Sequence, residues 1–161
     1  MMEFMSSNRT AALIGAFVIQ SIVSGACSFE SKTTPLAPAQ NQIDVTGRWA
    51  TDITVQGVTG RMTWTLTQTG SSATGPVLVG VSSGTVLFNG FLTGTLTGPS
   101  FGYTITVSPG GIPNQPACTG QLGGTMTVTM GAASRMVGPM SVIRSNCSIQ
   151  LPGTSLTLTK P

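Results

Sequence analysis

The 161-residue chain contains no histidine, and only 7% of its residues are charged. Soluble domains usually carry about 25% charged residues. Without histidine, the chain lacks the commonest general base and a principal zinc ligand. Its seven basic residues form no cluster, whereas affinity for a phosphate backbone depends on many clustered cations. The composition therefore predicts no nucleic-acid partner, and it leaves hydroxyl groups to face water in place of charges.

The sequence also lacks a convincing catalytic group. Residues 80–84 read Gly-Val-Ser-Ser-Gly and match the G-x-S-x-G pattern of serine hydrolases. No histidine base exists, however, and the segment lies between two strand-like stretches, so we interpret it as a turn. Asp44 and Asp52 would stand about 26 Å apart on one extended strand, too far to share a substrate atom. We expect a non-enzymatic protein without a cofactor.

Four methionines are the only remaining candidates for metal ligands. Met126 and Met130 share one face of their segment, and so do Met136 and Met140. A hairpin with a five-residue turn would set Met130 opposite Met136 and Met126 opposite Met140. Thioethers can bind Cu(I), but methionine is also an adaptable core residue. We interpret the four as core and predict no metal site.

The N-terminal region contains one apolar run, Ala11–Val23, which is too short to span a bilayer comfortably. It has the length of the apolar centre of a secretory signal. Ser24, Gly25 and Ala26 supply the small residues needed at a cleavage site. Residues 1–26 are therefore predicted to be a signal peptide, and the protein is predicted to be exported.

Ser24-Gly25-Ala26-Cys27 resembles a bacterial lipobox, although such boxes usually place Leu where Ser24 stands. The resemblance implies that Cys27 is acylated and becomes the mature N-terminus. Residues 27–43 are polar and contain proline, as expected for a disordered tether. The predicted location is the cell envelope, anchored in the outer membrane. The alternative is cleavage after Ala26 that releases a soluble secreted or periplasmic protein.

The cysteine count of three supports this interpretation, because an exported protein seldom leaves a thiol idle. Acylation of Cys27 leaves Cys118 and Cys147 to pair. Their disulfide would stabilise the fold by about 3 kcal/mol in the chain-entropy model.

Residues 44–161 follow a period of two, with apolar residues on one face and mostly threonine on the other. This alternation is typical of strands with one buried face. It is clearest in these segments: Met62–Thr67, Phe101–Val107, Leu122–Met130 and Leu156–Thr159. Short connections favour antiparallel hairpins, and closure removes exposed sheet edges. We predict an all-β, antiparallel up-and-down meander that closes into a barrel.

Turn signals set the number of strands. They occur at Gln56–Gly57, Thr69–Gly70, Ser83–Gly84, Gly98–Pro99 and Gly131–Ser134, with longer loops near 108–117 and 145–153. This spacing gives eight strands, or nine if Asn89-Gly90 is a hairpin turn.

Large and small residues share the inward register of these strands. The large ones would line a ligand cavity or fill the core: Trp49, Trp64, Phe88, Tyr103, Met126 and Met140. Barrels of about eight strands do either. The glycines at this register are Gly47, Gly94, Gly124 and Gly138. They would let the strands bend at barrel corners, or else make room for a ligand.

Gly47-Arg48-Trp49 opens the first predicted strand, and this Gly-x-Trp resembles the lipocalin and avidin families of barrels. The resemblance implies that Trp49 plugs one end of the barrel and packs against a cation from a late strand, for which Arg144 is the candidate. Trp49 and Trp64 are the only tryptophans, so the resemblance does not extend to an avidin pocket. The threonine- and glycine-rich composition of the chain after the lipobox also resembles that of small bacterial lipoproteins.

Two classes of function remain. The first is a non-catalytic envelope lipoprotein whose barrel binds a small apolar ligand or another envelope component. A filled core would instead favour a structural or protein-binding barrel. The second class is a small transmembrane β-barrel, in which the apolar face would contact lipid and threonine would line the lumen.

Overall fold

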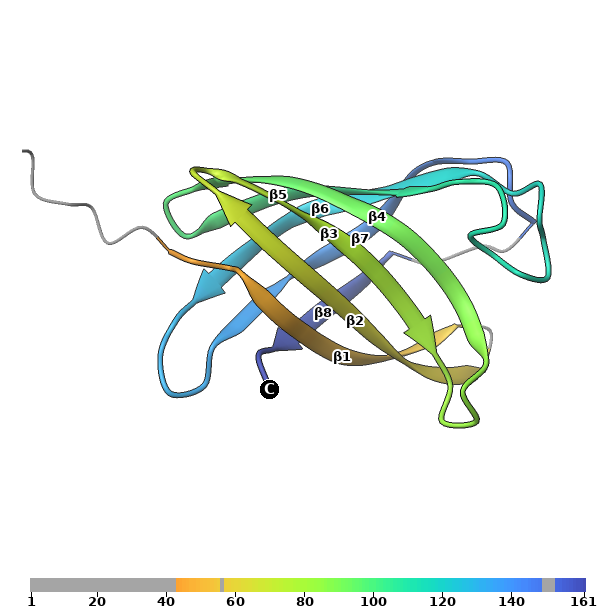
Figure 1. Ribbon diagram of the computed structural model, residues 1–161, viewed down its shortest axis with the longest axis horizontal. Helices are drawn as coiled ribbons and strands as arrows, with labels where there is room; N and C mark the ends of the chain where they lie inside the picture. The colour runs from red at the N-terminus through yellow and green to blue at the C-terminus, as the bar shows by residue number, and fades with distance from the viewer. Residues whose placement is uncertain (1–42, 56, 149–152) are drawn as a thin grey trace, which may run out of the picture. The chain divides into compact units, whose positions relative to one another are not determined.

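Eight antiparallel strands close into a barrel in the computed structural model, which describes residues 43–55, 57–148 and 153–161 (Figure 1). The strands are β1 (Gly47–Val55), β2 (Val58–Thr69), β3 (Ser72–Gly80), β4 (Val86–Thr97), β5 (Ser100–Val107), β6 (Gly120–Thr129), β7 (Arg135–Ser145) and β8 (Thr154–Thr159). Each strand pairs with the next in sequence, and β8 returns to β1. The predicted all-β up-and-down barrel is confirmed. The predicted signal peptide, Cys27 and all of the predicted tether except Ile43 lie outside the described residues.

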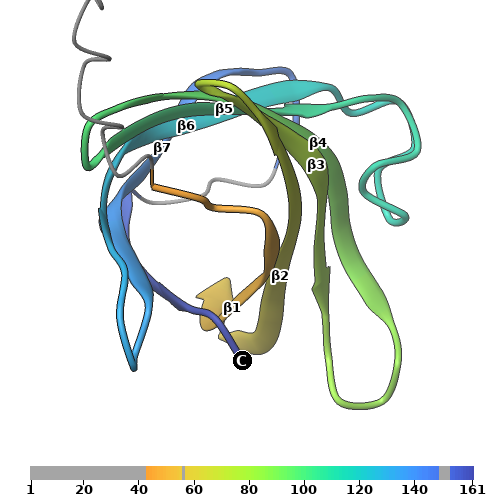
Figure 2. The ribbon, with the colours of Figure 1, turned by 60° about the vertical axis from the view of Figure 1, so that its left-hand side comes forward.

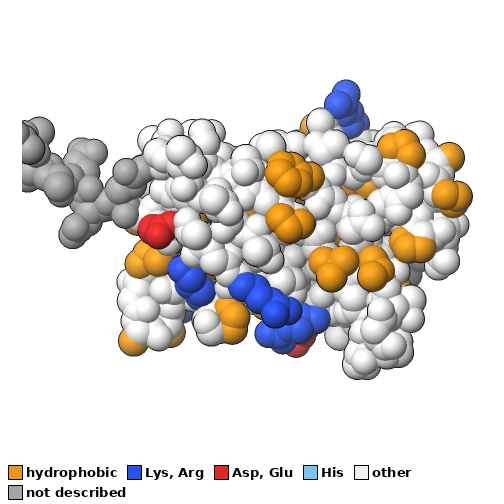
Figure 3. Space-filling view, viewed as in Figure 1, with side chains coloured by type: hydrophobic (Ala, Val, Ile, Leu, Met, Phe, Trp, Pro, Cys, Tyr) orange, Lys and Arg blue, Asp and Glu red, His pale blue; other side chains and the backbone are white. Residues whose placement is uncertain are grey.

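The period of two places the apolar side chains inside the barrel. Along β3, for example, every second residue from Ala73 to Val79 is buried and the residues between them are exposed. The strands curl around this apolar interior (Figure 2). The outer wall is mostly threonine, and on the face in Figure 3 it is largely neither charged nor apolar. Leu78 and Phe91 are exceptions on the outside of β3 and β4. Threonine suits an exposed pleated surface.

The turns fall where the sequence predicts them, and they decide between eight and nine strands. Gly70 and Gly98 adopt positive φ angles of 60° and 56° in the β2–β3 and β4–β5 turns. Asn89 and Gly90, by contrast, lie within β4 and pair with β3, so the barrel has eight strands rather than nine. A side chain at Gly90 would come within 2.9 Å of Ile105 Cγ2. Close packing on β5, rather than a turn, therefore accounts for this glycine.

The two ends of the barrel differ in their connections. At one end, on the left of Figure 1, lie the start of β1, the C-terminus and the connections 70–71, 98–99 and 130–134. We refer to it as the closed end. The other end, here termed the open end, carries the connections 56–57, 81–85, 108–119 and 146–153. The longest connections are therefore gathered at the open end, where loops are free to vary and to carry function.

Candidate functional site

The closed end is built around Trp49, which is completely buried. Its indole Nε1 donates a hydrogen bond to Val45 O at 2.8 Å. The Lys160 ammonium lies 5.6 Å from the centre of its ring, within the range of a cation–π interaction. The Lys160 side chain also lies against Gly47, because a Cβ there would be 2.9 Å from Lys160 Cε. Trp49 thus seals this end from inside, and a lysine covers it.

The prediction that Arg144 packs against Trp49 was wrong. Arg144 stands near the open end of β7, whereas Trp49 is near the closed end. The β6–β7 register shifts so that Leu122 faces Val142 and Gln121 faces Arg144, which leaves Ile143 as an extra residue. This bulge places Arg144 on the face of Gln121, opposite to the face of the buried Leu122. Lys160, directly after β8, takes the place beside Trp49.

The middle of the barrel, between the closed and open ends, is organised around Tyr103, the only tyrosine of the chain. Tyr103 lies between Gly94 of β4 and Gly124 of β6 in the strand register. Its hydroxyl donates a hydrogen bond to Pro139 O on β7 at 3.0 Å, and its ring centre lies 4.9 Å from that of Trp64. Burial raises the pKa of this phenol. The neutral phenol is therefore the form that the fold accommodates.

The inward glycines serve close packing. A Cβ on Gly94 would collide with the ring of Phe101, and Cβ atoms on Gly124 and Gly138 would collide with backbone atoms of the neighbouring strands. None of these three positions, nor Gly47, lines the cavity described below. Their role in the described structure is to let strands and aromatic rings approach one another.

Trp64 differs from Trp49 in its hydrogen bonding. Both rings are completely buried and the two residues pair across β1 and β2. Trp64 Nε1, however, has no hydrogen-bond partner among the described residues. A buried unpaired donor of this kind costs about 1–3 kcal/mol. The sequence pattern places both tryptophans inside but does not distinguish them in this respect.

The open end holds a cavity of ≈ 230 Å³. Every strand except β8 contributes to its walls, which are mainly apolar: Met62, Val79, Phe88, Val107, Leu122 and Met140. Polar groups occur at its rim, among them Asn114, Gln121 and Ser145. An engineered apolar cavity of about 150 Å³ is large enough to bind benzene. This cavity therefore has room for a somewhat larger apolar molecule.

The six inward residues predicted from the sequence divide between the core and this cavity. All six are buried in one cluster. Phe88 and Met140 line the cavity, whereas Trp49, Trp64, Tyr103 and Met126 do not. The barrel is thus filled with side chains through its closed half and hollow at its open end. The two alternatives left open by the sequence occur together in one interior.

The predicted methionine pairing was wrong. Thr129 faces Arg135 and Val128 faces Met136, so the β6–β7 turn begins one residue earlier than the predicted pairing requires. Met126, Met136 and Met140 are buried in the core, while Met130 is exposed in the turn. Within the described ranges, no three His, Cys, Asp or Glu side chains are grouped as a metal site would require.

The predicted disulfide between Cys118 and Cys147 is confirmed, and it lies at the open end. It links the connection 108–119 to the chain that follows β7. Asn146 N donates to Thr119 O at 3.1 Å, and Thr119 N donates to Asn146 Oδ1 at 2.7 Å. Together these bonds fix the two connections to each other at the rim.

The connection 108–119 is also held against β4. Asn89 N donates a hydrogen bond to Gly111 O at 2.7 Å. Ile112 is buried and lines the cavity, and Asn114 lines it as well. This loop therefore extends the cavity wall beyond the ends of β4 and β5.

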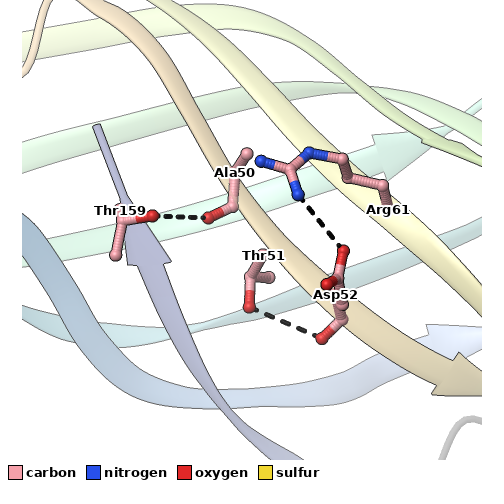
Figure 4. A network of polar contacts seen from close by, with 5 residues as sticks. All are labelled: Ala50, Thr51, Asp52, Arg61 and Thr159. Atoms are coloured by element: carbon pink, nitrogen blue, oxygen red, sulfur yellow. Dashed lines mark hydrogen bonds and ion pairs between the residues drawn. The ribbon is translucent and has the colours of Figure 1, made fainter. Parts of the chain in front are cut away.

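Arg144 lines the cavity at the open end, whereas the charged groups on and before β1 and on β2 are exposed. Arg61 and Asp52 form an exposed ion pair at 3.4 Å across β1 and β2 (Figure 4). Asp44 accepts a hydrogen bond from Thr46 N at 2.8 Å, and hydrogen bonding to Thr46 lowers the pKa of its carboxyl. Gly80 ends β3 and residues 81–84 lie in the β3–β4 turn, in which Val81 N donates to Thr85 O. The predicted turn at the G-x-S-x-G pattern is confirmed.

Comparison with protein-family models, curated proteins and solved structures found no match for this chain. In the part of the chain that the structure describes, no helix is long and apolar enough to cross a membrane.

Proposed function

We propose that this chain is an exported, lipid-anchored protein of the bacterial cell envelope whose barrel binds a small apolar ligand at its open end without catalysing a reaction. The observation that carries the ligand proposal is the ≈ 230 Å³ cavity with mainly apolar walls. Binding sites for small molecules are concave and mostly apolar, with a few polar groups that orient the ligand. Asn114, Gln121 and Ser145 would supply those groups at the rim.

The orientation of the side chains supports a ligand inside the barrel. The apolar residues of the strands face the interior and threonine faces outward. A barrel that spans a membrane presents its apolar face to lipid and lines its lumen with polar groups. The arrangement here is the reverse, and it suits an apolar molecule within and water outside.

The envelope location rests on the first 27 residues. The apolar run Ala11–Val23, the small residues before Cys27 and the polar stretch that follows match an export signal, an acylated cysteine and a tether. With Cys27 acylated, the remaining two cysteines form the disulfide that the structure contains.

Binding is tested by titrating the full chain with N-phenyl-1-naphthylamine, an apolar dye that fluoresces when it leaves water. We expect saturable binding that Met140→Trp weakens at least about tenfold, because this tryptophan would occupy the cavity. Val137→Trp is the control, since Val137 is on the same strand but exposed on its outer face. A dye that fails to bind the native chain, or that binds both variants equally, would contradict the proposal.

The anchor is tested separately with Cys27→Ser. We expect the native chain to incorporate labelled palmitate and to fractionate with membranes, and the variant to do neither. Native protein that remains soluble and unlabelled would contradict the lipid anchor but leave the ligand proposal intact.

A further inference from the structure

The weakest join in the barrel is between its first and last strands. β1 and β8 pair at a single position, Ala50 with Thr159. Thr159 Oγ1 donates a hydrogen bond to Ala50 O there at 3.4 Å. From that point towards the open end the two strands diverge, as Figure 4 shows. We refer to this join as the seam.

The length of β8 does not explain the divergence. In the register of the Ala50–Thr159 pair, Thr51 would face Leu158 and Val55 would face Thr154, so β8 has a residue for each position. None of these further pairs forms. Instead, β8 follows β7 over its whole length, from Thr159 opposite Arg135 to Thr154 opposite Met140.

Within residues 43–55, 57–148 and 153–161, two strand edges consequently have no paired strand at the open end. In β1, residues Thr51–Val55 pair with β2 only. In β7, residues Ser141–Ser145 lie beyond the last pair with β8. In an antiparallel strand, alternate backbone N–H groups point to each side. Some amides of Thr51–Val55 therefore face the seam, where none of the eight described strands pairs with them.

The cavity reaches the seam. Its walls include Ile53 on the unpaired part of β1, and Val142 and Ser145 on the unpaired part of β7. β8, which would separate these two strands, contributes no wall residue. On the opposite side the wall is extended by Ile112 and Asn114 of the connection 108–119. Among the described residues, the wall is therefore extended by the connection 108–119 on one side, and no residue of β8 closes it at the seam.

We infer that apolar ligands enter the cavity sideways through the seam, between the unpaired parts of β1 and β7, rather than along the axis of the barrel. The inference rests on the proposed function. It assigns Ile53 to the entrance, because this residue belongs both to the unpaired edge and to the cavity wall. Elongated apolar molecules suit such an entrance, since one end can occupy the cavity while the other remains in the gap.

The kinetics of N-phenyl-1-naphthylamine binding to the full chain test the route. A tryptophan at Ile53 would narrow the seam, and we expect Ile53→Trp to slow association and dissociation together by about tenfold. A tryptophan at Val58, which lines the cavity from the start of β2, would narrow the axial mouth. We expect Val58→Trp to weaken binding chiefly through faster dissociation. Slower association in Val58→Trp than in Ile53→Trp would overturn the inference in favour of axial entry.

Hydrogen exchange of the native chain tests the open edge without a substitution. We expect the seam-facing amides of Thr51–Val55 to exchange much faster than those of Arg61–Trp64, which pair on both sides. Dye binding should slow the first group alone. Equal protection of both groups in the free protein would overturn the inference even if the dye binds. Absence of dye binding would instead overturn the proposed function, and the two failures are distinguishable.

Discussion

The closed and open ends of the barrel are made of the same alternating strands, yet one is filled and the other is hollow. At the closed end two tryptophans and Phe101 are completely buried and short turns join the strands. At the open end smaller side chains such as Val79 and Val107 line a cavity, and long connections are tied by a disulfide. Aromatic side chains bury about 150–250 Å² each. Stability is therefore expected to reside at the closed end and binding at the open end.

The largest difference in unfolding free energy should appear when methionine is replaced by alanine at two positions of β7, one near the closed end and one at the cavity. Met136 is completely buried near the closed end of β7, whereas Met140 lines the cavity. We expect Met136→Ala to lower the free energy of unfolding by about 3–4 kcal/mol, and Met140→Ala by about 2 kcal/mol, because atoms beside a hollow have fewer contacts to lose. Urea unfolding measures both. Equal losses would remove the distinction between the two ends.

The disulfide should matter at the open end alone. Replacing both Cys118 and Cys147 by alanine is expected to cost about 3 kcal/mol of unfolding free energy. Hydrogen exchange should rise in the connection 108–119 and stay unchanged in the turn at 98–99. A reductant should have no further effect on the variant, which serves as the control. If the closed-end turn loosens as well, the two ends are coupled more strongly than their packing indicates.

Adding a methylene group should have opposite consequences at the two ends. Val128 is buried in the filled half, and Val107 lines the cavity. Val128→Leu is expected to overpack the interior and cost about 1–3 kcal/mol. Val107→Leu should change the unfolding free energy by less than about 1 kcal/mol, because the cavity has room for it, and should weaken dye binding. A large loss with Val107→Leu would show that the cavity is smaller in solution.

The smallest expected effect concerns Tyr103 at the boundary between the two halves. Burial raises the pKa of Tyr103, so the unfolded chain loses this proton at a lower pH than the folded one. The stability that it contributes is present below the ordinary tyrosine pKa of about 10 and declines as the pH rises above it. Tyr103→Phe should weaken this decline and cost about 1 kcal/mol at neutral pH through the lost bond to Pro139 O.

The single tyrosine makes this prediction directly measurable. The ultraviolet absorbance of its phenolate should appear in the folded protein only at a higher pH than in the urea-unfolded chain. Ionisation of Tyr103 at the same pH in both states would show that solvent reaches the middle of the barrel.

The strands and turns were predictable because they depend on local chemistry. The alternation of threonine with apolar residues has a period of two, which is the period of a strand. Gly70 and Gly98 directly follow β2 and β4 and adopt the positive φ angles of tight turns. The pairing of Cys118 with Cys147 was predicted from the number of cysteines together with the expected acylation of Cys27. These features are set by neighbours in sequence or by simple counting.

The details of the site depend on register, which the sequence does not display. Arg144 follows an extra residue at Ile143 and lines the open-end cavity instead of packing against Trp49, and Lys160 follows the last strand at a point where only barrel closure brings it to Trp49. A one-residue difference in the start of the β6–β7 turn changed the partner of Met136. Small shifts of this kind move every later contact along a strand.

The cavity and the seam were also beyond sequence reasoning. The inward residues Phe88 and Met140 look no different in sequence from Met126, although only the first two line the cavity. Whether a barrel is hollow depends on how summed side-chain volumes fill the interior. The seam depends on the closure of strands that are far apart in the chain.

The contact between Gly47 and the Lys160 side chain has a consequence for chain topology. It brings the start of the first strand and the residue after the last strand together at the closed end. These antiparallel neighbours could be joined by a short linker, and the chain could be reopened in the exposed turn at 81–85. In such a circular permutant every strand would keep both of its neighbours. The same barrel could thus form from a chain in which the strands follow one another in a circularly permuted order.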